Sequence, residues 1–226
     1  MVAPTNQGKT LWEMLKERMS GNGAGIPFRN PLDWRVESGV VLAAANGPDF
    51  AGYDFSVREI REYNRHIGGQ DFGFTDYVLA GTNTTTFNPD DALMARVRAV
   101  PNAVGGSDCL LLRLYDEISF DPTFLEVVKD TTGRFEINDE VTHSTEEYTR
   151  VNNVLDSYHA AVLVIGATTP DGKAANAKAT SAKLEYWDYW RDADIGGGRT
   201  AKQFVFVEMD SETGWFQIWR GGEFFR

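Results

Sequence analysis

The residues best suited to catalysis in this sequence are carboxylates that lie within or at the ends of apolar runs. Two neighbouring carboxylates can act as general acid and as base or nucleophile, as glycoside or phosphoester hydrolysis would require. Four acids occupy such positions: Asp116, Glu117, Glu185 and Glu208. Most acids in a chain with 33 of them are solvated, so a carboxylate-based hydrolase is the alternative hypothesis and not the leading one.

Aromatic residues beside these acids could bind a ligand or a partner. Residues 184–192, LEYWDYWRD, predict a strand in which Leu184, Tyr186, Asp188 and Trp190 face one way and Glu185, Trp187 and Tyr189 the other. Rings on both faces indicate a strand sandwiched between layers, or one whose second aromatic face is free for a ligand, and we favour the first interpretation. Trp215 and Trp219 could extend the same aromatic wall.

The amino-terminal segment predicts a second surface for a partner. Residues 10–19, TLWEMLKERM, have the apolar spacing of a short amphipathic helix, and SGNGAG follows as a joint. We expect this arm to dock on the body of the protein or to reach for another one. The residues predicted to bind a partner in the two regions are Leu11, Trp12, Leu15, Trp187, Trp190, Trp215 and Trp219.

Charge and composition narrow the classes of partner. A net charge of −11 disfavours nucleic acid and anionic lipid, because both would be repelled. The one cysteine, Cys109, lies in an apolar run, and the three histidines share no ligand spacing, so we expect no disulfide, metal or cofactor. No segment approaches 18 uncharged apolar residues, which predicts a cytoplasmic protein that reaches a membrane only through a partner.

Most of the remaining pattern predicts strands. Residues 202–221 have the spacing of a hairpin closed by DSETG, with Gly214 in a left-handed conformation. Residues 121–133 predict a helix with Asp121 as its cap, and residues 144–155 predict a second helix that begins with a capping box. Residues 88–100, NPDDALMARVRAV, begin like a helix and then alternate like a strand, so both interpretations stay open.

These elements together predict a β-rich α+β fold. We expect two packed, mostly antiparallel sheets or a partly open barrel, with two or three short helices and an N-terminal helical arm. The arm and its joint would occupy residues 1–25 and the β-rich domain residues 26–226. The segments beginning at residues 61 and 184 share the order Glu-Tyr, Ile-Gly-Gly and an aromatic strand, so an internal repeat with lobes near 26–105 and 106–226 is one interpretation.

The carboxyl-terminal quarter also carries a family resemblance. LEYWDYWRDAD followed by FVFVEMDSETGWFQIWRGGEF resembles uncharacterised bacterial β-rich proteins of the YjfK kind. Such proteins are generally encoded near relatives of phage shock protein A, so the resemblance implies an accessory role and gives no catalytic residue. The leading hypothesis is a non-enzymatic bacterial interaction or assembly protein that binds a partner protein, and a small-ligand sensor is a third hypothesis.

Overall fold

The structure of the chain is a computed structural model. It describes residues 39–40, 42, 50–67, 70–86, 92–101, 107–139, 143–151, 157–163, 179–195 and 197–224. The segment from 10 to 19, and with it Leu11, Trp12 and Leu15, lies outside the described residues, so the N-terminal arm stays a prediction.

The described strands form one eleven-stranded sheet in which every pairing is antiparallel. The main path of neighbours is β1-β2-β3-β4-β5-β11-β10-β9-β7-β6, and β8 pairs with β2 and β9. The strands are β1 (Gly39–Val40), β2 (Tyr53–Ile67), β3 (Gln70–Asn83), β4 (Leu93–Pro101), β5 (Ser107–Ile118), β6 (Arg134–Asp139), β7 (Ser144–Arg150), β8 (Ser157–Leu163), β9 (Ala179–Asp194), β10 (Thr200–Asp210) and β11 (Phe216–Glu223).

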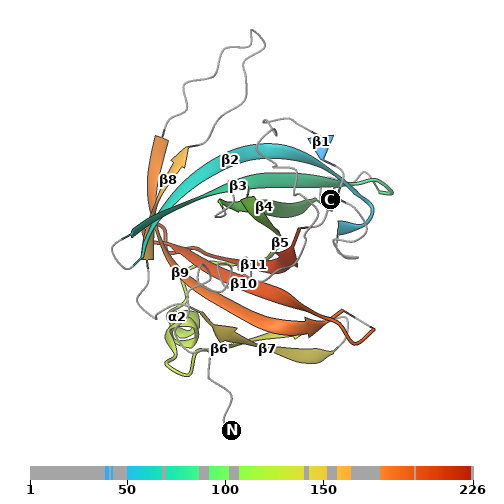
Figure 1. Cartoon of the computed structure of the whole chain (residues 1–226). Helices are drawn as coiled ribbons and strands as arrows, with labels where there is room; N and C mark the ends of the chain where they lie inside the picture. Colours follow the sequence, from blue (N-terminus) through green and yellow to red (C-terminus); the bar gives the residue numbers. More distant parts are fainter. Residues whose placement is uncertain are drawn as a thin grey trace.

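The sheet curves so that two groups of strands face each other. We call β2–β4 the first arm and β9–β11 the second arm; β5 joins them because it pairs with both β4 and β11 (Figure 1). At this junction Gly221 lies so close to β5 that an added Cβ would be 1.9 Å from the carbonyl oxygen of Leu111. Only glycine fits there, and the β5–β11 register also shifts between Ile218 and Trp219.

A hairpin and a helix cover the outer face of the second arm. β7 pairs with β9 only at Thr149 and Arg150, and the β6–β7 hairpin then crosses the strands. Along this path Tyr148 donates a hydrogen bond to Gln203 of β10, and the hairpin lies beside α2 (Pro122–Lys129) in Figure 1. The apolar layer between these covering elements and the second arm includes Val128, Phe135, Tyr148, Trp187, Tyr189, Val205, Val207 and Phe216.

The inner face of the curved sheet is also filled. Alternate residues of the second arm point inward, where Tyr186, Phe204, Phe206 and Trp219 are buried. On the first arm the inward residues include Tyr63 and Phe74, and the outward ones form a separate core with Val40 and Phe50. Both faces of the second arm are therefore buried, as rings on both sides of residues 184–190 predicted.

The prediction of two packed sheets or a partly open barrel, with several helices, is wrong. Hydrogen bonds run continuously from the first arm through β5 to the second, so the layers belong to one curved sheet. One helix occurs in the described part of the chain, α2, whose cap Asp121 accepts a hydrogen bond from the Thr123 amide as expected. Residues 144–150, predicted as helical, form strand β7 instead.

Several local predictions are confirmed. β10 and β11 form the expected hairpin, with Gly214 at φ 75°, and the alternating residues 93–99 lie in strand β4. Cys109 is buried in β5. The proposed repeat segments each form a hairpin, β2–β3 and β9–β10, and the division into two lobes stays a prediction.

Candidate functional site

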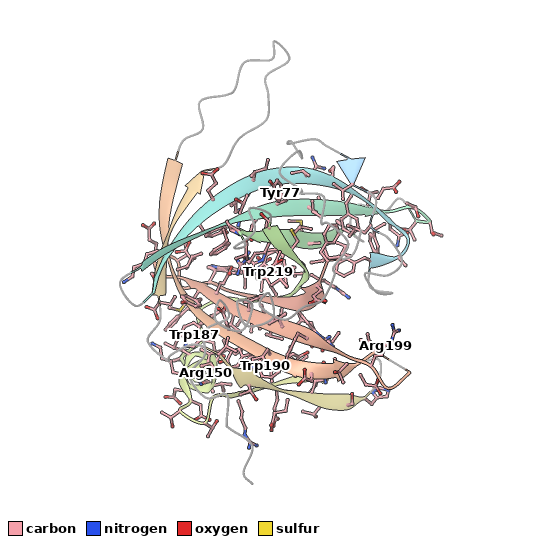
Figure 2. All side chains as sticks on the ribbon, viewed as in Figure 1. Tyr77, Arg150, Trp187, Trp190, Arg199 and Trp219 are labelled. Carbon is pink, nitrogen blue, oxygen red and sulfur yellow. The ribbon has the colours of Figure 1, made fainter. Side chains whose placement is uncertain are left out.

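The four predicted tryptophans do not form one exposed wall. Trp187 is fully buried beneath α2 and the β6–β7 hairpin, whereas Trp219 is buried on the inner side of the sheet (Figure 2). Trp190 is partly buried beside the inner cluster that contains Trp219, and Lys202 covers its ring at 3.2 Å. Trp215 alone among the four is exposed, at 52%. Three of these rings therefore stabilise the core, which leaves Trp215 as the accessible one.

The four predicted carboxylates do not meet either. Asp116 and Glu117 are adjacent exposed residues of β5 and project to opposite faces. Glu185 lies on the outer face of the second arm, 3.8 Å from Lys129, while Glu208 points into the interior. Glu117 and Glu208 both lie opposite Gln217 of β11 and so share a face, but one strand separates them. Glu208 is held by two arginines and Glu117 accepts a hydrogen bond from Gln217 at 2.7 Å, an arrangement that does not pair them as acid and base.

Glu208 belongs to a buried cluster of four charges that sequence reasoning did not find. Arg96 donates two hydrogen bonds to Glu208, at 2.8 and 2.9 Å, and Arg98 donates a third at 2.9 Å. Arg98 also pairs with both oxygens of Asp76, at 2.8 and 2.9 Å, and Arg96 lies 3.3 Å from the same carboxylate. Two positive and two negative charges are thus balanced, and they connect the first arm to the second.

Aromatic rings enclose this charge cluster. The Arg96 guanidinium lies 4.3 Å from the centre of the Trp219 ring, and that of Arg98 lies 4.2 Å from Phe74 and 5.0 Å from Phe206. Such contacts stabilise a desolvated cation by about 2 kcal/mol or more. The alternation of Arg96 and Arg98 with Ala95 and Val97 was the available sequence signal, because two arginines on one face of an otherwise apolar strand require buried partners.

The electrostatics of the cluster oppose proton transfer. Burial by itself disfavours the charged form of Glu208, but the charges and hydrogen bonds of Arg96 and Arg98 overcome this and lower its pKa well below the ordinary value. Burial, together with the carboxylates of Asp76 and Glu208, raises the pKa of Tyr63 to about 12. Both groups keep one protonation state near neutral pH, so the cluster can hold the arms together but is unsuited to acid–base catalysis.

A different surface carries exposed rings. Phe120 and Trp215 are 55% and 52% exposed. A Cβ added to Gly214 would lie 3.1 Å from the Phe120 side chain, so the loop before α2 touches the β10–β11 turn. Val127, 47% exposed, lies on α2, which begins two residues after Phe120. We call Phe120, Val127 and Trp215 the Phe120–Trp215 surface.

Sequence reasoning did not select Phe120. A hydrophobic residue just before a helix cap usually packs against the fourth residue of the helix, here Leu125, as a hydrophobic staple. That rule predicts a covered ring, whereas Phe120 is more exposed than any other large apolar side chain in the described part of the chain. Its exposure beside Trp215 is therefore the least expected feature of the surface.

Within the described residues, no group of three or more His, Cys, Asp and Glu side chains could hold a metal ion. No helix among the same residues is long and apolar enough to cross a membrane. In comparisons with known proteins, no family model, curated protein or solved structure matches this chain.

Proposed function

We propose that this chain is a non-enzymatic accessory protein of the bacterial cytoplasm that binds a partner protein through the Phe120–Trp215 surface. The observation that supports this most is the exposure of two large rings on touching loops, Phe120 and Trp215. Burying the exposed half of such a ring, on the order of 100 Å², would contribute about 2 to 3 kcal/mol. Exposed aromatic pairs of this kind are typical anchors of protein interfaces.

The surface is also shaped to present these rings. Trp215 follows Gly214, whose left-handed conformation closes the β10–β11 hairpin, and Asp210 accepts hydrogen bonds from the amides of Glu212 and Thr213 in the same turn. Asp121 caps α2 directly after Phe120. Because both loops are fixed by their own hydrogen bonds, little conformational entropy would be lost on binding.

The hydrolase alternative has less support. Glu208 is held ionised by two arginines, and Asp116, Glu117 and Glu185 lie on different strands or on opposite faces of one strand. We therefore favour the interaction protein over a glycosidase or phosphoesterase. The resemblance of residues 184–194 and 204–224 to YjfK-like proteins fits an accessory role and remains part of the proposal.

The experiment is an affinity purification from the cells that encode this chain. Phe120→Ala/Trp215→Ala is expected to lose a co-purifying protein that the wild type retains, and the captured protein is then purified and tested for direct binding. Ile195→Ala is the matched control, because Ile195 is 53% exposed but lies beyond the opposite end of β10. Equal recovery of every protein with the wild type and the double variant would refute the proposal.

A second candidate, a small-ligand sensor, is favoured by one observation in the interior. Nε of Arg96 and Nε1 of Trp219 are buried donors without an acceptor among the described residues. A neutral molecule with an oxygen acceptor could satisfy them, whereas an anion would disturb the balanced charges. A thermal-shift screen with neutral metabolites tests this, because a ligand at 100 times its Kd adds about 2.7 kcal/mol, and Trp219→Phe should reduce that shift.

A further inference from the structure

We infer that the segment bound by the Phe120–Trp215 surface is cationic, with lysine or arginine flanking an apolar anchor. This inference rests on the proposed function, because it specifies the chemistry of the partner at the same surface. It follows from the charges that surround the exposed rings.

The two stretches that form the surface are strongly acidic. Residues 115–132 and 210–215 contain seven acids and one lysine. Glu126 directly precedes Val127, and Glu212 lies three residues before Trp215. Both glutamates are exposed. Lys129, the lysine of these stretches, lies 3.8 Å from Glu185 on β9 and is thus already near a carboxylate. Exposed Lys183, whose carbonyl oxygen accepts a hydrogen bond from the Ser211 amide, is a second cation beside the 210–215 turn and leaves the acids in excess.

Two acids of this region accept hydrogen bonds from neighbouring groups. Asp121 accepts the Thr123 amide of α2, and hydrogen bonds from Thr132 lower the pKa of Asp130. The apolar rings are therefore bordered by carboxylates, two of which these hydrogen bonds hold in place. A cationic partner would gain about 0.2 to 1 kcal/mol for each surface ion pair.

A second copy of the chain or a membrane would fit the acidic residues around the Phe120–Trp215 surface less well than a basic segment. A second copy of the chain would bring identical acids together across a two-fold interface, which costs energy through repulsion of like charges. An anionic membrane would be repelled for the same reason, in keeping with the net charge of −11. Charge complementarity therefore selects a basic segment of another protein.

Two synthetic peptides test the inference on the full chain. One is an amphipathic helix with leucine and phenylalanine on one face and lysine on the other, and its twin carries glutamate at each lysine position. Binding is measured by fluorescence anisotropy of labelled peptide. The lysine peptide should bind the wild type, and its affinity should fall at least about tenfold between about 50 and about 500 mM NaCl. Its affinity for Phe120→Ala/Trp215→Ala should be lower than for the wild type.

Matched charge variants make the test specific to this surface. Glu126→Gln/Glu212→Gln should weaken binding of the lysine peptide about three- to tenfold, because two surface ion pairs are removed. Asp54→Asn/Glu62→Gln removes the same charge from exposed positions of β2 on the first arm and should change affinity less than about twofold. The control thus separates a local effect from the general attraction of a cation to an acidic protein.

The possible failures are distinguishable. Equal binding of the glutamate twin, or equal weakening by both charge variants, would overturn the cationic inference. The proposed function would still stand if Phe120→Ala/Trp215→Ala lost the cellular partner in the same preparation. If that double variant affected neither the peptide nor the partner, both the inference and the proposed function would be wrong.

Discussion

Replacing Glu208 by glutamine tests the buried charge cluster that joins the two arms. Glu208 is 4% exposed and accepts three hydrogen bonds, from Arg96 and Arg98. Glutamine keeps the shape but leaves two buried guanidinium groups with Asp76 as the single anion. Breaking a buried ion pair on one side costs about 3 to 5 kcal/mol, which is a large share of the roughly 5 to 15 kcal/mol typical of a domain.

The assay is urea unfolding at pH 7, followed by far-UV circular dichroism. Glu208→Gln should lower the free energy of unfolding by about 3 to 5 kcal/mol, whereas Glu117→Gln, on an exposed position of β5, should change it by less than about 0.5 kcal/mol. Adding Arg96→Met to Glu208→Gln restores charge balance and should recover at least about 1 kcal/mol. A loss below about 1 kcal/mol for Glu208→Gln would refute the reasoning, because the carboxylate would then be dispensable to the arms.

Three further outcomes follow from the same structure. Because the pKa of Glu208 is lowered in the folded chain, its ionised form stabilises the fold fully above the ordinary pKa of 4.5. Below that pH the free energy of unfolding should fall by about 1.4 kcal/mol per pH unit. Urea titrations from pH 6 to about pH 3 should show this slope in the wild type and a shallower one in Glu208→Gln; equal slopes would contradict it. Trp215→Phe should remove tryptophan emission that acrylamide quenches, and Trp187→Phe should remove emission that acrylamide does not reach; the reverse assignment would show that their burial is wrong. Gly221→Ala should cost at least about 3 kcal/mol in urea unfolding, because its Cβ would overlap the Leu111 carbonyl, against about 1 kcal/mol for Gly197→Ala, which meets no atom within 4 Å; similar losses would count against the close approach.

Local features were predictable from the sequence where one residue type dictates the conformation. Gly214 after an acidic turn predicted the last hairpin, and Asp121 before proline predicted α2. The alternation of rings in residues 184–190 correctly predicted a strand buried on both faces. These signals act within a few residues, so they survive in any tertiary context.

The remaining features depend on contacts between distant segments. The capping box at Ser144 predicted a helix, but Tyr148 and Arg150 alternate into the covered face of the second arm, and burial of that face favours strand β7. Rings on both faces of one strand suggest two sheets equally well as one curved sheet, and the choice depends on the β5–β11 pairing that Gly221 permits.

The candidate surface was only partly predictable for the same reason. Trp215 was among the selected residues, but Trp187 and Trp219 have the same residue type and their burial depends on the covering hairpin and the opposite arm. The carboxylate of Glu208 was selected for catalysis, although its partners Arg96 and Arg98 are more than 100 positions earlier in the chain. Residue type alone could not separate these roles.

Hydrogen–deuterium exchange of the chain with and without its purified partner tests the central claim most directly. We predict slower exchange confined to residues 119–127 and 211–216 when the partner is bound, and no such protection with Phe120→Ala/Trp215→Ala. Protection elsewhere, for example along β2 or β6, with these two stretches unchanged would contradict the claim that the partner docks at the Phe120–Trp215 surface.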